Sequence, residues 1–418
     1  MRRSSSAFRL AAAAAATLVA TAGLSACSSG DAGGKTTLQY GIWDQEQQPA
    51  MEKIVAAFED ENPDIDVKIQ LTPYSNYFTK LQTAATGGSA PDVFWMNGPN
   101  FKLYASNGQL AELTDVDASK YPQGLIDLYT YDGKLYGAPK DFDTIGVWYN
   151  KDLFDAAGVE YPQAGWTWDD YLDTAKALTD PEAGIWGSAA ALRDQEGFYN
   201  TIPQAGGEVI SADGKKTGFD SPEALQGIEF WTNQIKEGVS PTQQQMTDTN
   251  PEDAFMSGKI AMYWNGSWAA AKYNSDPAFM EVVDVAPLPA GPTGNQSVIH
   301  GVANVVNAKS SHLEAAEKFA AFASGETAAK IQAESAAAIP AYEGMQQAWI
   351  DSSPHFQLQV FIDALDTAVA YPTSQNSAVW MNAQQDILAQ VWAGSVTPQE
   401  GLKDLAAQMQ AALDEENQ

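Results

Sequence analysis

The chain has 418 residues, 44% of them hydrophobic and 18% charged, a length that suits two domains and a composition that can bury a core. Asp and Glu number 53 against 23 Lys and Arg, and the resulting net charge of −30 excludes a protein that binds nucleic acid through a basic surface. The single cysteine excludes an intrachain disulfide and every zinc or iron–sulfur site built on cysteines, and the three histidines are too scattered to suggest another metal site. We therefore expect neither a metal nor a cofactor.

The N-terminus, residues 1–26, has the organisation of a secretion signal. Three arginines precede or flank the start of an apolar run at residues 10–22 that is too short for a permanent membrane anchor. Small residues then lead to the only cysteine, in a sequence that resembles a bacterial lipobox, Leu24-Ser25-Ala26-Cys27. The resemblance implies that Cys27 carries a lipid and begins the mature chain, followed by a flexible tether over residues 27–36. The alternative is an ordinary secretory signal in which the cysteine has no role.

One arginine, Arg193, remains once this signal is removed. Sites that bind phosphates or dicarboxylates use guanidinium groups, which make two parallel hydrogen bonds to such anions. The sequence therefore argues against an anionic ligand, and the acidic surface is most simply explained by solubility.

Strand and helix patterns alternate from residue 37 to residue 107. Apolar residues alternate at 37–43 and 65–71 and run together at 92–96, which predicts three strands. Apolar spacing and breaker residues predict a helix from Pro49 to the break at Asn62-Pro63, and further helices at 75–86 and 100–107. This order predicts a parallel, right-handed α/β sheet, in which ligands bind beyond the carboxyl ends of the strands.

A second α/β unit is predicted after residue 144, beyond a stretch from residue 110 whose pattern is irregular. The expected strands are 145–149, 260–264 and 298–307, and the expected helices are 168–178, 222–236 and 252–256. The Pro- and Gly-rich residues 286–294 predict a loop near a domain boundary. We expect the last third to be helical, with a helix that begins near Leu313 and others at 383–392 and 398–413.

Seven segments in register resemble the extracellular solute-binding proteins of carbohydrate ABC importers, the maltose-binding-protein-like group. They are the lipobox at Cys27, Phe58-x-x-x-Asn62-Pro63-x-Ile65-x-Val67, Gly87-Gly88-Ser89-Ala90-Pro91-Asp92-Val93, Tyr149-Asn150-Lys151-Asp152-Leu153-Phe154, Gly165-Trp166-Thr167-Trp168-Asp169-Asp170, Phe255-x-x-Gly258-Lys259-Ile260-Ala261-Met262 and Asn265-Gly266-Ser267-Trp268. Their order and spacing cover nearly the whole mature chain.

The resemblance implies an α/β, two-lobed periplasmic-binding-protein-like fold, in which each lobe is a sheet flanked by helices and about three hinge crossovers join the lobes. Lobe one is expected to comprise residues 37–143 and 302–350, and lobe two residues 144–301 and 351–418. The implied function is capture of an oligosaccharide by lobe closure and its delivery to the permease subunits of an ABC transporter, with no enzymatic activity. We expect a monomer, held at the extracellular face of the cell membrane by the lipid on Cys27.

A sugar presents hydroxyl groups that need hydrogen-bond partners and flat C–H faces that pack on aromatic rings, so its site combines acids and amides with tryptophan and tyrosine. Residues beyond the predicted strand ends or at the first crossover fit this chemistry: Trp43, Asp44, Glu46, Asn97, Asn100, Asp141 and Asp143. The resemblance adds Trp268 and Trp380 as aromatic platforms, singles out Asp143 as a ligand-binding acid, and makes Glu196, Phe198 and Tyr199 part of a ligand-binding loop. Gly301, at the second crossover, would let its backbone approach the ligand.

Two other functions share parts of this pattern. A secreted glycoside hydrolase also combines paired carboxylates with aromatic subsites, but 53 acids make some close pair inevitable and no other catalytic motif occurs. A polyamine- or peptide-binding protein of the same architecture is compatible with the acidic composition. For a sugar bound by ionised carboxylates, we expect little pH dependence of affinity near neutrality.

Overall fold

The computed structural model describes residues 35–417. The predicted signal, Cys27 and all but the last two residues of the predicted tether lie outside the described residues. Thr36, predicted as the end of the tether, is the first residue of strand β1 (Thr36–Ile42). Between residues 35 and 417, no helix combines the length and hydropathy needed to span a membrane.

The first sheet has seven strands in the order β12-β6-β11-β3-β1-β2, and β13 pairs with the first residues of β11. Its other members are β2 (Ile65–Leu71), β3 (Val93–Asn97), β6 (Gly137–Asp143), β11 (Val298–Val306), β12 (Ile339–Pro340) and β13 (Val369–Ala370). The predicted parallel arrangement is confirmed for β2, β1 and β3. The prediction did not extend to the later strands, among which β11 runs antiparallel to both β3 and β6. The reason is that β6 runs toward the second sheet whereas β11 returns from it.

Five helices pack on this sheet: α1 (Gln48–Glu61), α2 (Tyr74–Gly87), α3 (Gly98–Ser106), α13 (Leu313–Ser324) and α14 (Glu326–Glu334). Helix α1 buries Met51, Ile54 and Phe58, spaced as one face of a helix requires. Helix α2 is followed by Gly88 in the left-handed conformation, the usual end of a helix. Helices α1, α2 and α3 agree with the predicted bounds within two residues, and α13 begins at the predicted residue, whereas no bounds were predicted for α14.

The irregular stretch after residue 110 contains only short elements: η1 (Ala118–Lys120), α4 (Gln123–Leu128), β4 (Thr130–Tyr131) and β5 (Lys134–Leu135). None is long enough to show a hydrophobic period. Strand β6, which follows them, is buried along its whole length and includes Lys140, Asp141 and Asp143. These charged residues hide the strand from a search for apolar runs.

The second sheet has the strand order β10-β7-β9-β8. Its strands are β7 (Ile145–Asn150), β8 (Trp186–Ser188), β9 (Ile260–Gly266) and β10 (Val283–Ala286); β8 is parallel to β9, whereas β7 is antiparallel to both β9 and β10. The surrounding helices are α5 (Lys151–Ala157), α6 (Trp168–Leu178), η2 (Asp194–Phe198), α7 (Tyr199–Gln204), α8 (Pro222–Lys236), α9 (Gln243–Asp248), α10 (Pro251–Met256), α11 (Ala269–Ser275) and α12 (Pro277–Val282). Helices α6 and α8 have the predicted bounds because Thr167 and Ser221 cap their first turns.

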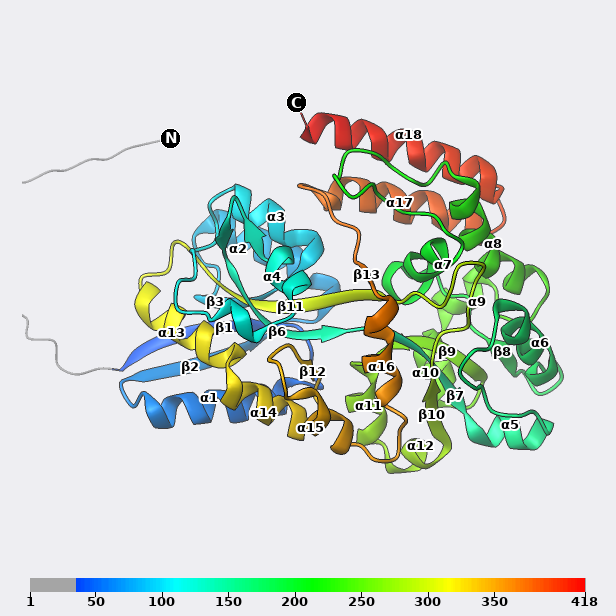
Figure 1. Cartoon of the computed structure of the whole chain (residues 1–418), viewed down its shortest axis with the longest axis horizontal. Coiled ribbons are helices and arrows are strands. Elements are labelled where there is room, and N and C mark those ends of the chain that lie inside the picture. The colour runs from blue at the N-terminus through cyan, green and yellow to red at the C-terminus, as the bar shows by residue number, and fades with distance from the viewer. Residues whose placement is uncertain (1–34, 418) are drawn as a thin grey trace, which may run out of the picture. The chain divides into compact units, whose positions relative to one another are not determined.

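The last part of the chain is helical, as predicted: α15 (Gln346–Asp351), α16 (Gln359–Asp363), η3 (Ala364–Thr367), α17 (Ser377–Trp392) and α18 (Pro398–Glu416). Helices α17 and α18 pack on each other and on α8, at the upper right of Figure 1. Helix α17 begins at Ser377, well before the predicted residue 383, because its first turns are anchored by Trp380 in the core.

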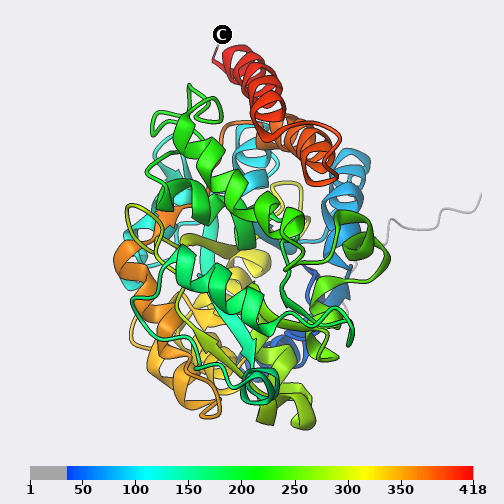
Figure 2. The same ribbon diagram turned by 90° about the vertical axis from the view of Figure 1, so that its right-hand side faces the viewer.

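Three connections between the two sheets meet at one place. Thr144 links β6 to β7, and its hydroxyl donates a hydrogen bond to the carbonyl of Phe361 at 2.7 Å. The Ser297 hydroxyl, which precedes β11, accepts a hydrogen bond from the Ile145 amide at 2.8 Å, and the Ser297 carbonyl accepts one from Val369 at 2.9 Å. Figure 1 shows β6 and β11 side by side at the middle of the ribbon, with α16 crossing near their ends, and Figure 2 gives the same ribbon from the side. Within residues 35–417, the two sheets are therefore joined by three connecting segments that lie next to one another.

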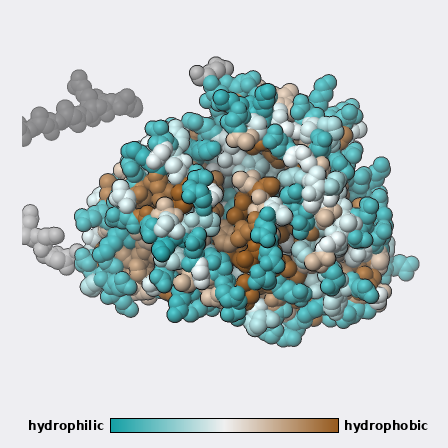
Figure 3. All heavy atoms as spheres, viewed as in Figure 1, coloured by the Kyte–Doolittle hydropathy of each residue, from teal (hydrophilic) through white to brown (hydrophobic). Residues whose placement is uncertain are grey.

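The surface follows the composition. Figure 3 shows a mainly hydrophilic face on which the hydrophobic residues gather toward the middle, where the two sheets are joined. Three large hydrophobic side chains are strongly exposed among the described residues, Tyr74, Leu313 and Val379. An acidic, mostly polar exterior of this kind favours solubility.

Candidate functional site

A cavity of about 590 Å³ lies among elements of both sheets, a volume within the usual range of small-molecule sites. Its wall includes the ends of β3 and β6 and the residues after β1 from the first sheet, and η2, α10 and β9 with the residues after it from the second. Six carboxylates line it against a single guanidinium: Asp44, Asp141, Asp143, Asp194, Glu196 and Glu252 with Arg193. Six aromatic residues also line it: Trp43, Tyr74, Phe142, Tyr263, Trp268 and Tyr371.

The wall from the first sheet carries an aromatic platform. Trp43, which follows β1, makes edge contacts with Trp95 and Tyr77, each with ring centroids 5.1 Å apart, and with Tyr74 at 5.6 Å. Trp43 remains half-buried, so part of its ring faces the cavity. Asn97, at the end of β3, donates a hydrogen bond to the Tyr74 hydroxyl at 3.2 Å. Neighbouring rings thus hold Trp43 and Tyr74 in place without a ligand.

Asp143 lies where β6 meets the second sheet. Its carboxylate accepts a hydrogen bond from the side-chain amide of Gln195, on η2, and its Oδ2 lies 3.9 Å from Nδ1 of His300. Nε2 of His300 accepts a hydrogen bond from the Gly98 amide at 3.2 Å, so the proton of the neutral ring is on Nδ1, toward Asp143. Burial raises the pKa of Asp143, and the facing His300 opposes this. Asp143 therefore joins side chains from both sheets at the floor of the cavity.

The wall from the second sheet includes a π-helical turn, η2, a form that often marks functional sites. It places Asp194, Gln195 and Glu196 on the cavity. The Asn200 side chain holds the turn from behind by donating to the carbonyls of Gln195 and Gly197 at 2.7 and 3.0 Å. Asp194 accepts a hydrogen bond from the Tyr371 hydroxyl at 2.9 Å.

Glu196 is the most strongly perturbed acid of this wall. Burial raises its pKa to about 7, Arg193 opposes the rise, and the charge of Asp194 adds to it. At neutral pH this carboxyl is therefore divided between its protonated and ionised forms. This pKa predicts some pH dependence of affinity near neutrality, in contrast to the expectation for a site whose carboxylates are all ionised.

Trp268 owes its position to the glycine two residues before it. The indole ring lies over Gly266, so closely that a Cβ atom on Gly266 would be 1.9 Å from ring atom Cζ3. Ser267, between them, is buried and lines the cavity, and its hydroxyl has no hydrogen-bond partner. The half-buried Trp268 ring is thus placed on the cavity wall beside an unused hydroxyl group.

Seven of the residues predicted for the site line the cavity: Trp43, Asp44, Asn97, Asp141, Asp143, Glu196 and Trp268. Six others do not, which corrects their assignment. Glu46 is exposed, and its backbone amide donates to Asp44 at 2.8 Å as part of a turn. Asn100 is bound to the side chain of Asn97, which caps α3. Glu46 and Asn100 each lie three or four residues beyond the end of their strand, β1 and β3 respectively.

The other four corrections concern buried residues. Trp380 is fully buried, and its indole nitrogen donates to the Ser374 hydroxyl at 2.9 Å. Phe198 and Tyr199 are about 1% exposed and pack in the core of the second sheet. Gly301 is required by strand packing, because a Cβ atom there would be 2.7 Å from the Asp141 carbonyl and 2.8 Å from Leu125. Hydrophobic burial, and not the cavity, determines these positions.

Several lining residues escaped the sequence analysis: Gln45, Gln47, Tyr74, Asp194, Gln195, Asn250, Glu252, Tyr263, Asn265, Ser267, His300, Tyr371 and Met381. Asn265 and Ser267 belong to a quoted motif, and Asp194 and Gln195 adjoin Glu196, so proximity to predicted residues was a usable signal. Met381 likewise adjoins the predicted Trp380, whereas Tyr371 offered no signal, because it follows no predicted strand and adjoins no predicted residue. No group of three or more His, Cys, Asp or Glu side chains within residues 35–417 is arranged to hold a metal ion.

The model of one protein family, described as bacterial extracellular solute-binding protein, matches residues 43–330. A putative binding protein from Brucella abortus is 27% identical over 293 residues, which cover 68% of this chain and 69% of the relative. A galactooligosaccharide-binding protein from Bacillus subtilis is 28% identical over 320 residues, 73% of each chain.

Two solved structures are similar over most of the chain. An ABC substrate-binding protein from Listeria monocytogenes, in complex with cycloalternan, has a TM-score of 0.85 and 32% identity, covering 91% of this chain and 99% of the other. The GacH receptor of Streptomyces glaucescens, solved unliganded and with acarbose, has a TM-score of 0.83 and 25% identity, with the same coverage of 91% and 99%.

Proposed function

The chain belongs to the bacterial extracellular solute-binding protein family, and we propose that it captures an oligosaccharide and delivers it to the permease subunits of an ABC transporter. The predicted fold class is confirmed, because the chain is an α/β protein with the two-lobed fold of periplasmic binding proteins. The observation that carries the proposal is the cavity, which combines aromatic faces with carboxylate and amide groups from both lobes. Relatives named for galactooligosaccharides, arabinooligosaccharides and maltodextrin support this ligand class.

The ligand is a neutral sugar. Its hydroxyl groups donate to the carboxylates of the cavity, and its flat C–H faces pack on Trp43 and Trp268. Six carboxylates against one guanidinium disfavour an acidic sugar, because like charges repel where water is scarce. The aromatic rings distinguish this cavity from one that selects a polyamine by charge alone.

Closure of the lobes traps the ligand. In this proposal lobe one comprises residues 37–143 and 302–350, and lobe two residues 144–301 and 351–418. The hydrogen bond between Gln195 and Asp143, and the contact of α3 with α17, join the two lobes. A ligand that touches both lobes adds contacts that exist only in the closed form, and so shifts the population toward it.

The family consists of binding proteins of transporters, and we propose that this member has no enzymatic activity of its own. The lipid on Cys27 holds it at the extracellular face of the cell membrane, and it acts there as a monomer. The resemblance of residues 24–27 to a lipobox supports the anchor.

A thermal-shift screen tests the function. The mature chain without its lipid is mixed with mono- to hexasaccharides, polyamines and short peptides, and a ligand that binds only the folded state raises the unfolding midpoint. We expect a shift with a neutral oligosaccharide, recovered intact, and a smaller shift for Trp268→Ala. Recovery of shortened sugar would favour the glycoside hydrolase, and a shift with polyamines or peptides alone would overturn the sugar assignment.

A further inference from the structure

Strand β6 contains a bulge at the floor of the cavity. Its register with β11 pairs Asp141 with Val302 and Pro139 with Ala303, which leaves Lys140 as an extra residue without a partner. In a regular strand, the side chains of neighbouring residues point to opposite faces. Here the Lys140 ammonium group instead forms an ion pair with the carboxylate of its neighbour Asp141. The bulge thus brings two adjacent charged side chains together.

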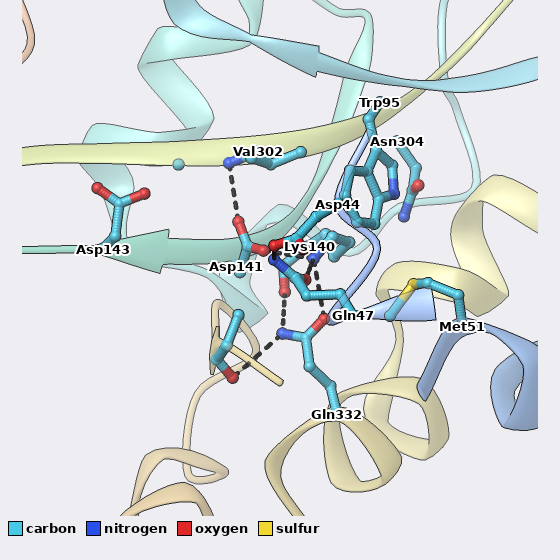
Figure 4. Close-up of polar contacts among 12 residues, drawn as sticks. Asp44, Gln47, Met51, Trp95, Lys140, Asp141, Asp143, Val302, Asn304 and Gln332 are labelled. Carbon is cyan, nitrogen blue, oxygen red and sulfur yellow. Dashed lines mark hydrogen bonds and ion pairs between the residues drawn. The ribbon is translucent and has the colours of Figure 1, made fainter. Parts of the chain in front are cut away.

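Lys140 does not face the cavity. Its side chain is 1% exposed, and the ammonium group donates to Oε1 of Gln47 at 2.9 Å, to Oε1 of Gln332 at 3.1 Å and to Asp141. An ammonium group has three protons, so these acceptors use all of them. The face of the Trp95 ring lies 4.4 Å from the same nitrogen. Figure 4 shows Lys140 among these groups.

Two carboxylates that do line the cavity depend on this lysine. Oδ2 of Asp141 accepts a hydrogen bond from Lys140, and Oδ1 accepts one from the backbone amide of Val302 at 3.0 Å. Asp44 accepts a hydrogen bond from the side-chain amide nitrogen of Gln47 at 2.9 Å. The oxygen of the same amide accepts a hydrogen bond from Lys140. A chain of contacts therefore runs from Asp44 through Gln47 and Lys140 to Asp141. Each acid keeps lone pairs that no protein group uses.

We propose that Lys140 is a positioning residue, which sets Asp141 directly and Asp44 through Gln47 as acceptors for sugar hydroxyl groups without touching the sugar itself. The inference rests on the proposed function. Removal of the ammonium group would leave the buried Asp141 carboxylate without its cation, a costly state that is relieved by a change of side-chain position or by uptake of a proton. Either change removes an acceptor from the cavity.

A double-mutant cycle tests the proposal, with the member of a panel of maltodextrins, galactooligosaccharides and arabinooligosaccharides that binds wild type most tightly. Lys140→Met is expected to weaken binding about 10-fold or more, the usual effect of losing one hydrogen bond to a charged group. In the Asp141→Asn background the same change should have a clearly smaller effect, because only the route through Gln47 to Asp44 remains. Lys330→Met, at an exposed lysine of α14, is the matched control and should leave binding unchanged.

Gln332→Met provides a second route if Lys140→Met does not fold. Gln332 is buried away from the cavity and supplies one of the three acceptors of Lys140, so its loss should weaken binding by about threefold, and by less where Asp141 is replaced by Asn. Equal effects with and without Asp141 would show a general loss of structure. That result would overturn this inference and leave the proposed function standing. If wild type binds no sugar of the panel, the proposed function fails, and this inference fails with it.

Discussion

Replacing Gly266 by alanine should displace the Trp268 ring, because the glycine lies directly beneath it. The added Cβ atom would be 1.9 Å from Cζ3 and 2.2 Å from Cε3 of the indole, whereas ordinary contacts begin at 3.4 Å. The ring must therefore move by about 1.5 Å, since the neighbouring atoms of β9 are buried backbone that cannot yield. A platform moved this far no longer matches a sugar held by the other wall of the cavity.

The loss of sugar affinity in Gly266→Ala follows from the stacking energy of one aromatic ring. An aromatic contact contributes about 1 kcal/mol beyond the area it buries, so Gly266→Ala should weaken sugar binding by at least about fivefold. Isothermal titration calorimetry measures this for Gly266→Ala, Trp268→Ala and the double variant. We expect the double variant to bind like Trp268→Ala, because the methyl group acts only through the ring.

Gly124→Ala is the control, because a Cβ atom at Gly124 meets no other atom within 4 Å. It should bind sugar like wild type. Unchanged affinity of Gly266→Ala would refute the reasoning, as would a further loss when Gly266→Ala is added to Trp268→Ala.

Three further predictions concern single residues. Ionised Glu196 is the better acceptor for hydroxyl groups and its pKa is about 7, so sugar affinity should fall as the pH drops from about 8 to about 6. Glu196→Gln should remove this pH dependence. A rise in affinity over the same pH drop would contradict the assignment. Because that pKa is raised above its unfolded value, Glu196 also stabilises the unliganded fold most at low pH, and this contribution is lost as the pH rises through about 7. Trp380→Ala should lower the free energy of unfolding by about 3–5 kcal/mol in urea titrations and leave the Kd unchanged, whereas weaker binding at full stability would return Trp380 to the site. Cys27→Ser should move the protein from the membrane fraction to the medium, and retention in the membrane would exclude the lipid anchor.

The sequence located the first wall of the cavity well. Trp43, Asp44 and Asn97 follow strands of the parallel part of the first sheet, and the carboxyl ends of parallel strands meet at one edge. Strand prediction was therefore enough to bring these residues together. Asn100 and Glu46 show the limit of that reasoning, because proximity along the chain does not say which way a side chain points.

The aromatic residues show a second limit. Trp268 and Trp380 both occupy positions that resemble platforms, yet the first faces the cavity and the second is wholly buried. The difference is decided by helix α17, which packs Trp380 against the core of the second sheet. Resemblance to a family predicts where a residue lies along the chain, but its burial depends on all of its neighbours in space.

The sequence by itself determined the α/β class, the bounds of the longer helices and strands and the family, because hydrophobic period, capping residues and local motifs act over a few residues. Only the tertiary structure decided the antiparallel place of β6 and β11, the bulge that joins Lys140 to Asp141, and the environment that raises the pKa of Glu196. Each of these depends on segments far apart in the sequence. Pairing direction, burial and electrostatic environment are sums over neighbours in space, which a local pattern does not contain.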